Sequence, residues 1–127
     1  MGLLIKNMNN KVIEIYKEER PWGNFERFTQ NQMTTVKIIT VMGGEKLSLQ
    51  FHKRRNEFWR ILSGEGTATV GEENVEVSQG DECHIPVGVK HSIEGKNEGV
   101  IFLEISFGDF DEEDEVRLAD KYGREKN

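Results

Sequence analysis

Residues 44–64, GEKLSLQFHKRRNEFWRILSG, carry the pattern on which the fold of this protein depends. Polar and apolar side chains alternate along 46–52, as they do in a β-strand that is buried on one side. The polar face holds Lys46, Ser48, Gln50 and His52, and the apolar face holds Leu47, Leu49 and Phe51. In a small barrel the polar face would line an interior pocket. The stretch therefore predicts a strand whose inward side chains are available for chemistry.

The rest of the chain repeats the strand pattern at short, regular intervals. Alternating β-branched and aromatic residues predict strands at 11–16, 33–41, 46–52, 57–62, 67–71, 74–78, 82–86 and 100–107. Glycine-containing segments such as 63–66 and 95–99 predict turns between them. Only 112–122 has the pattern of a helix. We therefore predict one all-β domain over 1–127, a sandwich or barrel with a short C-terminal helix.

The charged residues exclude one class of partner. The chain has 127 residues and a net charge of −6, and its acid is concentrated in DFDEEDE at 109–115. A phosphate backbone requires a basic surface, so nucleic acid is not an expected partner. The acidic run is expected to be the solvated start of the predicted helix, where negative charge suits the helix dipole.

Composition also bears on location. No apolar run approaches the roughly 20 residues of a membrane span, and MGLLIKNMNN at 1–10 lacks the pattern of a secretory signal. Cys83 is the single cysteine, which excludes an internal disulfide and is consistent with a reducing compartment. We therefore expect a cytoplasmic protein that makes no contact with a membrane.

A second glycine-framed stretch, GDECHIPVGVKH at 80–91, supplies one more candidate ligand. Pro86 and Gly88 predict a tight turn that aims His91 back toward the barrel. The two stretches would then place four side chains together inside the barrel, those of Gln50, His52, Glu57 and His91. Two imidazoles and one carboxylate suit Fe, Mn, Co or Zn and leave open positions, while Gln50 would add a neutral oxygen ligand or orient a water.

The spacing of both stretches resembles the two motifs of the cupin superfamily. The first cupin motif, G-x5-H-x-H-x4-E-x6-G, fits 44–64 with Gln50 in place of its first histidine. The second, G-x5-P-x-G-x2-H, fits 80–91, although the asparagine that closes it in the family is Gly95 here. The resemblance implies a cupin double-stranded β-helix, or jelly-roll barrel, with a bound divalent metal.

A more detailed likeness points to one family within the cupins. RPWG at 20–23, EKLSLQFHKRRNEFW at 45–59, GVIFLEISFG at 99–108 and DEEDEVRLADKYGR at 111–124 resemble the C-terminal cupin domain of type II phosphomannose isomerases. The likeness implies interconversion of mannose 6-phosphate and fructose 6-phosphate, with metal ligands at Gln50, His52, Glu57 and His91. In that family the domain usually follows a mannose-1-phosphate guanylyltransferase domain. These 127 residues hold no such domain, so guanylyl transfer is not expected of them.

The chain departs from this family at two histidines. Where the family typically reads Q-x-H-x-H-R-x-E-H-W, the second histidine is Arg54 and the one before tryptophan is Phe58. The family's arginine is kept as Arg55. An arginine fork suits a 6-phosphate group, because guanidinium binds its oxygens bidentately. Alternation favours Arg54 for this role and the resemblance favours Arg55, with a solvated charged hairpin as the alternative for both.

Other side chains complete the predicted site. The base that moves a proton between C1 and C2 is expected among Glu104, Glu45 and Lys46. Glu104 lies in the apolar run VIFLEISF, and burial raises the pKa of a carboxylate toward neutrality. Further substrate contacts are expected from Trp59, Arg20, Arg117 and Arg124.

Two rival functions fit the same pattern. One is a non-catalytic, metal-bearing cupin that binds a sugar phosphate or nucleotide sugar and partners a separate guanylyltransferase. The other is an iron-dependent dioxygenase, since the same ligand set can activate oxygen. For any of them, the apolar row of Leu47, Leu49 and Phe51 must be covered by an N-terminal strand or a second subunit, and we expect a homodimer.

Overall fold

The computed structural model describes residues 11–108 and 111–119, and nearly all of its regular structure is β-sheet. The strands are β1 (Tyr16–Arg20), β2 (Gly23–Arg27), β3 (Thr34–Val41), β4 (Leu49–His52), β5 (Asn56–Val70), β6 (Glu73–Ser78), β7 (Glu82–Ile85), β8 (His91–Phe107) and β9 (Glu115–Ala119). A short 3-10 helix, η1 (Glu112–Asp114), precedes the last strand. β6 shows the alternation on which the prediction relied, because Val75 and Val77 are buried between exposed neighbours. The all-β prediction is confirmed.

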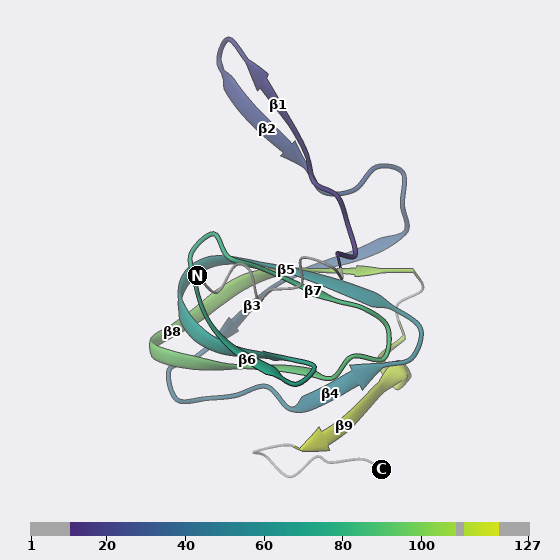
Figure 1. Ribbon diagram of the computed structural model, residues 1–127, viewed down its shortest axis with the longest axis vertical. Coiled ribbons are helices and arrows are strands. Elements are labelled where there is room, and N and C mark those ends of the chain that lie inside the picture. The colour runs from purple at the N-terminus through teal and green to yellow at the C-terminus, as the bar shows by residue number, and fades with distance from the viewer. Residues whose placement is uncertain (1–10, 109–110, 120–127) are drawn as a thin grey trace.

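The strands form two sheets. In the larger one β6, β5, β8, β4 and β9 are neighbours in this order, with β3 also paired to β8 and β7 to β5, and the sheet curls into a barrel (Figure 1). β1 and β2 form a separate antiparallel hairpin that projects from the barrel (Figure 1). The strand predicted at 11–16 is wrong, because only Tyr16 is in a strand. The backbone N–H of Val12 instead donates to the His84 ring, 3.1 Å away.

β5 and β8 are much longer than the predicted strands because two expected turns do not occur. β5 continues through 63–66 and β8 continues through 95–99, and the two strands pair on both sides of a bulge. Gly64 and Gly99 lie at this bend with φ angles of 81° and 99°. A Cβ atom on Gly64 would lie 2.1 Å from the carbonyl oxygen of Gly99. The glycines therefore bend a continuous strand instead of ending it.

Alternate side chains of β5 and β8 point into the barrel and form its core. The rings of Trp59 and Phe102 pack with centroids 4.7 Å apart, among buried aliphatic side chains from several strands. Glu57 and Glu104 continue the same alternation, each two residues from one of these aromatics, and both are buried. The fold thus places carboxylates on the same inward face as the hydrophobic core.

The apolar row predicted on 46–52 behaves differently from the expectation. Leu47 turns to the core, and Leu49 and Phe51 are half-buried in β4, alongside the paired strand β9. The N-terminal segment covers another outer surface, where Phe28 packs against Phe58 of β5 with ring centroids 5.7 Å apart.

The helix predicted at 112–122 is wrong over its described part. η1 is a single turn, and the residues after it form β9, which pairs antiparallel with β4. Val116 and Leu118 are two residues apart, so strand alternation accommodates them as well as a helix does. Backbone groups along the edge of β4 then decide in favour of a strand. Residues 120–122 lie outside the described residues.

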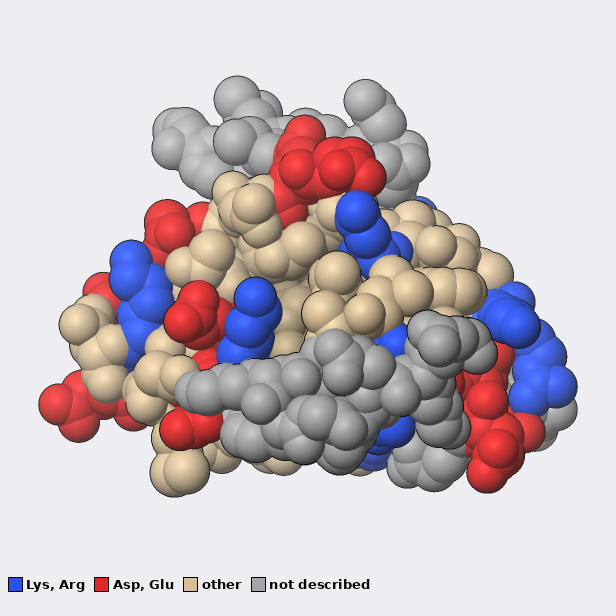
Figure 2. Space-filling model, turned by 90° about the horizontal axis from the view of Figure 1, so that it is seen from below, with Lys and Arg blue, Asp and Glu red and all other residues tan. Residues whose placement is uncertain are grey.

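Charged side chains of both signs share the face that Figure 2 shows. On it, Lys and Arg lie beside Asp and Glu (Figure 2). This mixture differs from the single-sign basic field that recognition of a phosphate backbone requires. Within the described ranges, no helix is long and apolar enough to span a membrane.

Candidate metal centre

His52, Glu57 and His91 meet inside the barrel from three strands. His52 ends β4, Glu57 lies near the start of β5 and His91 begins β8. One ligand atom from each lies within 4.8 Å of the others, and none of the three residues is more than 3% exposed. Glu57 is central, because its Oε2 lies 3.2 Å from His52 Nε2 and its Oε1 lies 3.5 Å from His91 Nε2.

Both histidine rings are oriented by main-chain carbonyls. Nδ1 of His52 lies 3.1 Å from the carbonyl oxygen of Asp114, and Nδ1 of His91 lies 2.9 Å from that of Val89. A carbonyl only accepts, so each Nδ1 carries the proton and donates. Each Nε2 therefore faces Glu57 and, once unprotonated, offers its lone pair to a metal, which is the arrangement that metal-binding histidines require.

The donor set fits a divalent cation. Glu57 Oε1 is buried and has no hydrogen-bond partner among the described residues, a state that costs free energy unless a cation or water satisfies it. Burial acts to raise the pKa of Glu57, but the hydrogen bond from His52 and the charges of His91, His52 and Arg55 outweigh it and lower the pKa to about 2. The carboxylate is therefore anionic at neutral pH. Two imidazoles and this carboxylate would hold the metal.

The two histidines differ in their electrostatics. Burial acts to lower the pKa of His52, but its hydrogen bond to Glu57 and the charge of that carboxylate raise the pKa above its usual value. Burial lowers the pKa of His91, and the charge of Glu57 does not offset this effect. A neutral His91 favours ligation, because a metal binds the unprotonated Nε2.

Gln50 lies beside the cluster but its side chain is engaged elsewhere. Its Cα pairs with that of His91 across β4 and β8, which places it next to the histidines. Its amide nitrogen donates to the Ser48 hydroxyl at 2.8 Å. Its role as a fourth ligand stays a prediction.

The two arginines after His52 diverge. Arg55 turns inward, where its Nε donates to Glu57 Oε2 at 3.1 Å and its Nη2 lies 3.4 Å from His52 Nε2. Arg54 points outward and donates to Asp111 at 2.8 Å. The structure thus brings Arg55 into the cluster and leaves Arg54 at the surface.

A second buried carboxylate lies on the same inward face. Glu104 of β8 accepts a hydrogen bond of 3.2 Å from the indole Nε1–H of Trp59. Burial and the negative charge of Glu57 raise the pKa of Glu104 to about 7, while Lys37 and the bond from Trp59 act in the opposite direction. The Trp59 ring also contacts His91 edge-on, with centroids 5.8 Å apart. Of the predicted bases and pocket walls, Glu104 and Trp59 are therefore beside the cluster.

The remaining predicted residues are distributed more widely. The main chain of Lys46 pairs with that of Glu94 in an isolated bridge, and the main chain of neighbouring Glu45 bonds that of Gly95, so the backbone of both residues lies beside 94–95 of β8. Arg20 ends β1 in the projecting hairpin, where it pairs with Glu18. Arg124 lies outside the described residues.

Arg117 is the tail arginine that reaches the neighbourhood of the site. It lies opposite Gln50 in the β4–β9 pair, on the same face of the sheet. Its Nη2 pairs with Glu115 at 2.9 Å, and its Nε is buried with no hydrogen-bond partner among the described residues.

Three residues at the site were not predicted. Ser106 donates to Glu57 Oε2 at 3.3 Å, Lys37 lies opposite Glu104 in the β3–β8 register, and Asp114 contacts His52. Alternation from Glu104 could have identified Ser106, because both lie on one face of β8. No local signal could have identified Asp114, since its contact spans more than sixty residues.

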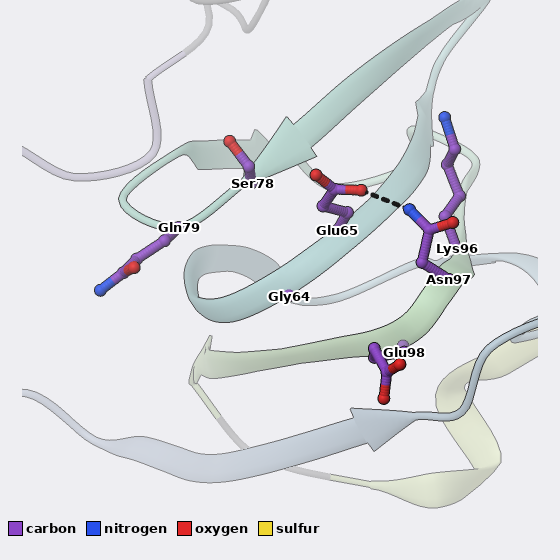
Figure 3. A pocket seen from close by; sticks show the side chains of 8 residues that line it. Gly64, Glu65, Ser78, Gln79, Lys96, Asn97 and Glu98 are labelled. Carbon is purple, nitrogen blue, oxygen red and sulfur yellow. Dashed lines mark hydrogen bonds between the residues drawn. The ribbon is translucent and has the colours of Figure 1, made fainter.

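The barrel also has a surface pocket of about 500 Å³ that is unrelated to the cluster. Glu65 and Asn97, joined by a hydrogen bond of 2.6 Å, line it near the bends of β5 and β8 (Figure 3). Its other polar side chains, on Ser78, Gln79, Lys96 and Glu98, are exposed. The chemistry-bearing residues thus lie elsewhere in the barrel.

Comparison with known proteins agrees with this geometry. The family model described as "Mannose-6-phosphate isomerase C-terminal" matches residues 7–120. Mannose-1-phosphate guanylyltransferase 2 of Escherichia coli O157:H7 is 38% identical over 110 residues, covering 84% of this chain and 22% of that protein. Xanthan biosynthesis protein XanB of Xanthomonas campestris pv. campestris is 39% identical over 112 residues, covering 85% and 24%. The chain therefore spans less than a quarter of the length of these relatives.

Solved structures support the fold. Oxalate decarboxylase from Bacillus subtilis superposes with a TM-score of 0.63 at 26% identity, covering 68% of this chain and 24% of that chain. KdgF from Halomonas sp. superposes with a TM-score of 0.61 at 13% identity, covering 68% and 78%, which is a likeness of fold alone.

Proposed function

Because the chain belongs to the family of mannose-6-phosphate isomerase C-terminal cupin domains, we propose that it is a metal-dependent isomerase that interconverts mannose 6-phosphate and fructose 6-phosphate. One observation carries the proposal, the buried His52–Glu57–His91 group with a second buried carboxylate, Glu104, on the same inward face. The first group would provide a metal centre and the second a candidate base, the two parts that metal-assisted aldose–ketose isomerisation uses.

The reaction moves one proton between two carbons. A base removes the proton from C2 of mannose 6-phosphate and returns it to C1, while O2 loses a proton and O1 gains one through an enediol. A bound divalent metal would polarise the carbonyl and stabilise the negative charge that develops on these oxygens.

We assign Glu104 as the base that carries the proton between C2 and C1. A carboxylate with a pKa of about 7 both accepts and returns a proton near neutral pH. The Trp59 Nε1–H holds one of its oxygens in place. Glu57 is unsuited to the role because its pKa of about 2 keeps it anionic, as a ligand requires.

For the 6-phosphate we propose Arg117, with Lys37 as a second cation. Arg117 has a buried Nε with no partner among the described residues and lies across from Gln50, which supports a role toward an anion at the centre. Arg54 is paired with Asp111 at the surface, and Arg55 is buried against Glu57, so both are occupied by protein carboxylates.

A coupled assay tests the isomerase. Protein stripped of metal and reloaded separately with Mn, Co, Zn or Fe(II) is given mannose 6-phosphate, and fructose 6-phosphate is detected through phosphoglucose isomerase and glucose-6-phosphate dehydrogenase. We expect metal-dependent NADPH formation that Glu57→Gln abolishes. Flat traces from folded, metal-loaded protein would contradict the isomerase.

The alternative is a binding module that serves a separate guanylyltransferase. It is favoured by the similarity to mannose-1-phosphate guanylyltransferase 2 of Escherichia coli O157:H7, of which this chain spans 22%. Calorimetry with mannose 6-phosphate and with GDP-mannose distinguishes the two functions. Tight binding without turnover would select the module, whereas turnover would exclude a purely non-catalytic role.

A homodimer and a cytoplasmic location stay predictions. The surface that supports a dimer is the outer face of β3, where Val36 is 56% and Ile38 is 65% exposed. Light scattering across a range of concentrations should give twice the mass of one chain, and the Ile38→Glu variant should give the mass of a single chain. A wild type that is monomeric at every concentration would exclude the dimer. Cell fractionation tests the location.

A further inference from the structure

Asp114 contacts three consecutive residues of the metal-binding segment. Its carboxylate accepts hydrogen bonds from the backbone N–H groups of Lys53, at 2.8 Å, and Arg54, at 2.9 Å. Its main-chain carbonyl lies 3.1 Å from Nδ1 of His52. Asp114 is buried, and its contact with His52 is buried as well, while the bonds to Lys53 and Arg54 are partly buried.

We propose that Asp114 is a positioning residue for the metal centre, which orients His52 and holds the turn between His52 and Glu57 in its metal-binding geometry. This inference rests on the metal centre of the proposed function and is independent of isomerase turnover.

The turn needs an external support because it lies between two strands. β4 ends at His52 and β5 begins at Asn56, so 53–55 have no place in the sheet. Hydrogen bonds from backbone N–H groups to a carboxylate are charge-assisted and stronger than neutral ones. Two of them on successive residues hold the path of the chain from one ligand to the next.

The carbonyl of Asp114 acts on His52 directly. It accepts a hydrogen bond from Nδ1–H and thereby keeps Nε2 as the ring nitrogen that faces Glu57, 3.2 Å away. Outer partners of this kind set the tautomer of a ligating histidine, and their loss typically lowers metal affinity by about 10–100-fold.

Asp111 provides a matched control on the same segment. Its carboxylate accepts from the Arg54 side chain at 2.8 Å and caps η1 through the N–H of Glu113 at 2.9 Å. Both groups of the Asp111–Arg54 pair are exposed, and exposed pairs contribute little. Asp111→Asn therefore removes a tail carboxylate that contacts the turn only through the exposed Arg54 side chain, and it leaves the backbone hydrogen bonds to Asp114 in place.

The experiment compares wild type, Asp114→Ala, Asp114→Asn and Asp111→Asn by competition for Zn²⁺ and Co²⁺ with a chelator. We expect Asp114→Ala to lower the affinity for both ions by about 10–100-fold and Asp114→Asn to lower it less. The affinity of Asp111→Asn should stay within about twofold of the wild-type value. Asp114→Asn should have the smaller effect because its single amide oxygen can replace one of the two carboxylate oxygens that accept backbone N–H groups.

A second readout isolates positioning from general destabilisation. Nitrogen-15 NMR of the metal-free protein at alkaline pH should show His52 protonated on Nδ1 in wild type and in Asp111→Asn. The Asp114 variants keep the main-chain carbonyl, so loss of the carboxylate acts through the released turn: they should lose amide-exchange protection at Lys53 and Arg54, and the resulting shift of His52 should populate its Nε2-protonated form. If Asp114→Ala does not fold, the chelator competition and the NMR experiment are both made on Asp114→Asn.

Two results would overturn the inference, and they differ. If wild type binds metal and the folded Asp114 variants bind it equally with an unchanged tautomer, the positioning role is wrong and the metal centre stands. If wild type binds none of the ions, the metal centre falls and this inference falls with it.

Discussion

The indole Nε1–H of Trp59 donates a hydrogen bond of 3.2 Å to the Glu104 carboxylate inside the barrel. This bond joins the hydrophobic core to the polar site, because the Trp59 ring also packs on Phe102 and against His91. One aromatic side chain therefore orients the candidate base and lies against a candidate ligand.

Replacing Glu104 should separate turnover from metal binding. Glu104→Gln keeps the size of the side chain and its ability to accept from Trp59, but it cannot take up a proton. We expect the turnover of mannose 6-phosphate to fall by about 10²–10⁴-fold while metal affinity stays within about twofold. The coupled assay and a chelator competition measure the two quantities. Unchanged turnover in this variant would remove Glu104 from the mechanism.

Trp59→Phe tests orientation without removing the base. The substitution keeps an aromatic ring in the core and deletes the hydrogen bond to Glu104. We expect kcat to fall by about tenfold, with KM and metal affinity nearly unchanged. The Glu104 carboxylate remains in the variant but is no longer held in the orientation that proton transfer needs. An effect confined to KM would indicate that the tryptophan contacts substrate instead.

Removing the Glu57 carboxylate should abolish stabilisation by metal. A ligand that binds only the folded state raises the free energy of unfolding by about 2.7 kcal/mol at a concentration of 100 Kd. We expect the unfolding midpoint of wild type to rise with added metal and that of Glu57→Gln to stay constant. Glu76→Gln, which changes a surface carboxylate bonded to Lys96, is the matched control and should respond like wild type. Equal shifts in all three proteins would place the metal elsewhere.

His84 should make the fold sensitive to acid. It is buried, and burial lowers its pKa below the ordinary 6.5, with Lys11 acting in the same direction and Glu82 and Glu14 opposing. The unfolded chain takes up a proton near 6.5 that the folded protein resists. The contribution of His84 to stability is thus fully present above that pH and is lost as pH falls below it.

NMR titration checks this assignment, and the His84 pKa should lie below 6.5. On acidification, wild type should also lose more stability in urea unfolding than His84→Gln does. A pKa at or above the ordinary value would contradict the burial argument.

Gly64 should tolerate no side chain. An added Cβ would lie 2.1 Å from the Gly99 carbonyl, and φ is 81°. We expect Gly64→Ala to lower the free energy of unfolding by about 3 kcal/mol or more, since overpacking and backbone strain add. Gly80→Ala shares a positive φ of 91° but meets open space, so strain alone should cost about 1–2 kcal/mol. Equal losses in urea unfolding would show that the close approach is unimportant.

The local pattern was sufficient to predict the all-β class, most of the barrel strands and the candidate ligands. Alternation along 46–52 and the spacing of 44–64 and 80–91 predicted that His52, Glu57 and His91 would share an interior, and the structure brings them within 4.8 Å. Alternation is a property of neighbouring residues, so the sequence alone contains it. It also failed locally, because the turn at 53–55 interrupts the period and directs Arg55 inward in place of Arg54.

The sequence by itself therefore determined the all-β fold, the paired motifs and the three candidate ligands, all of which depend on short-range periodicity and spacing. Only the tertiary structure decided that 115–119 form a strand, that β5 and β8 continue through their bends, and that Asp114 supports His52. The physical reason is the same in each case. Each outcome depends on backbone or polar groups that pair with partners far away in the sequence. The edge of β4 pairs with 115–119, β5 pairs with β8 across their bends, and His52 bonds Asp114.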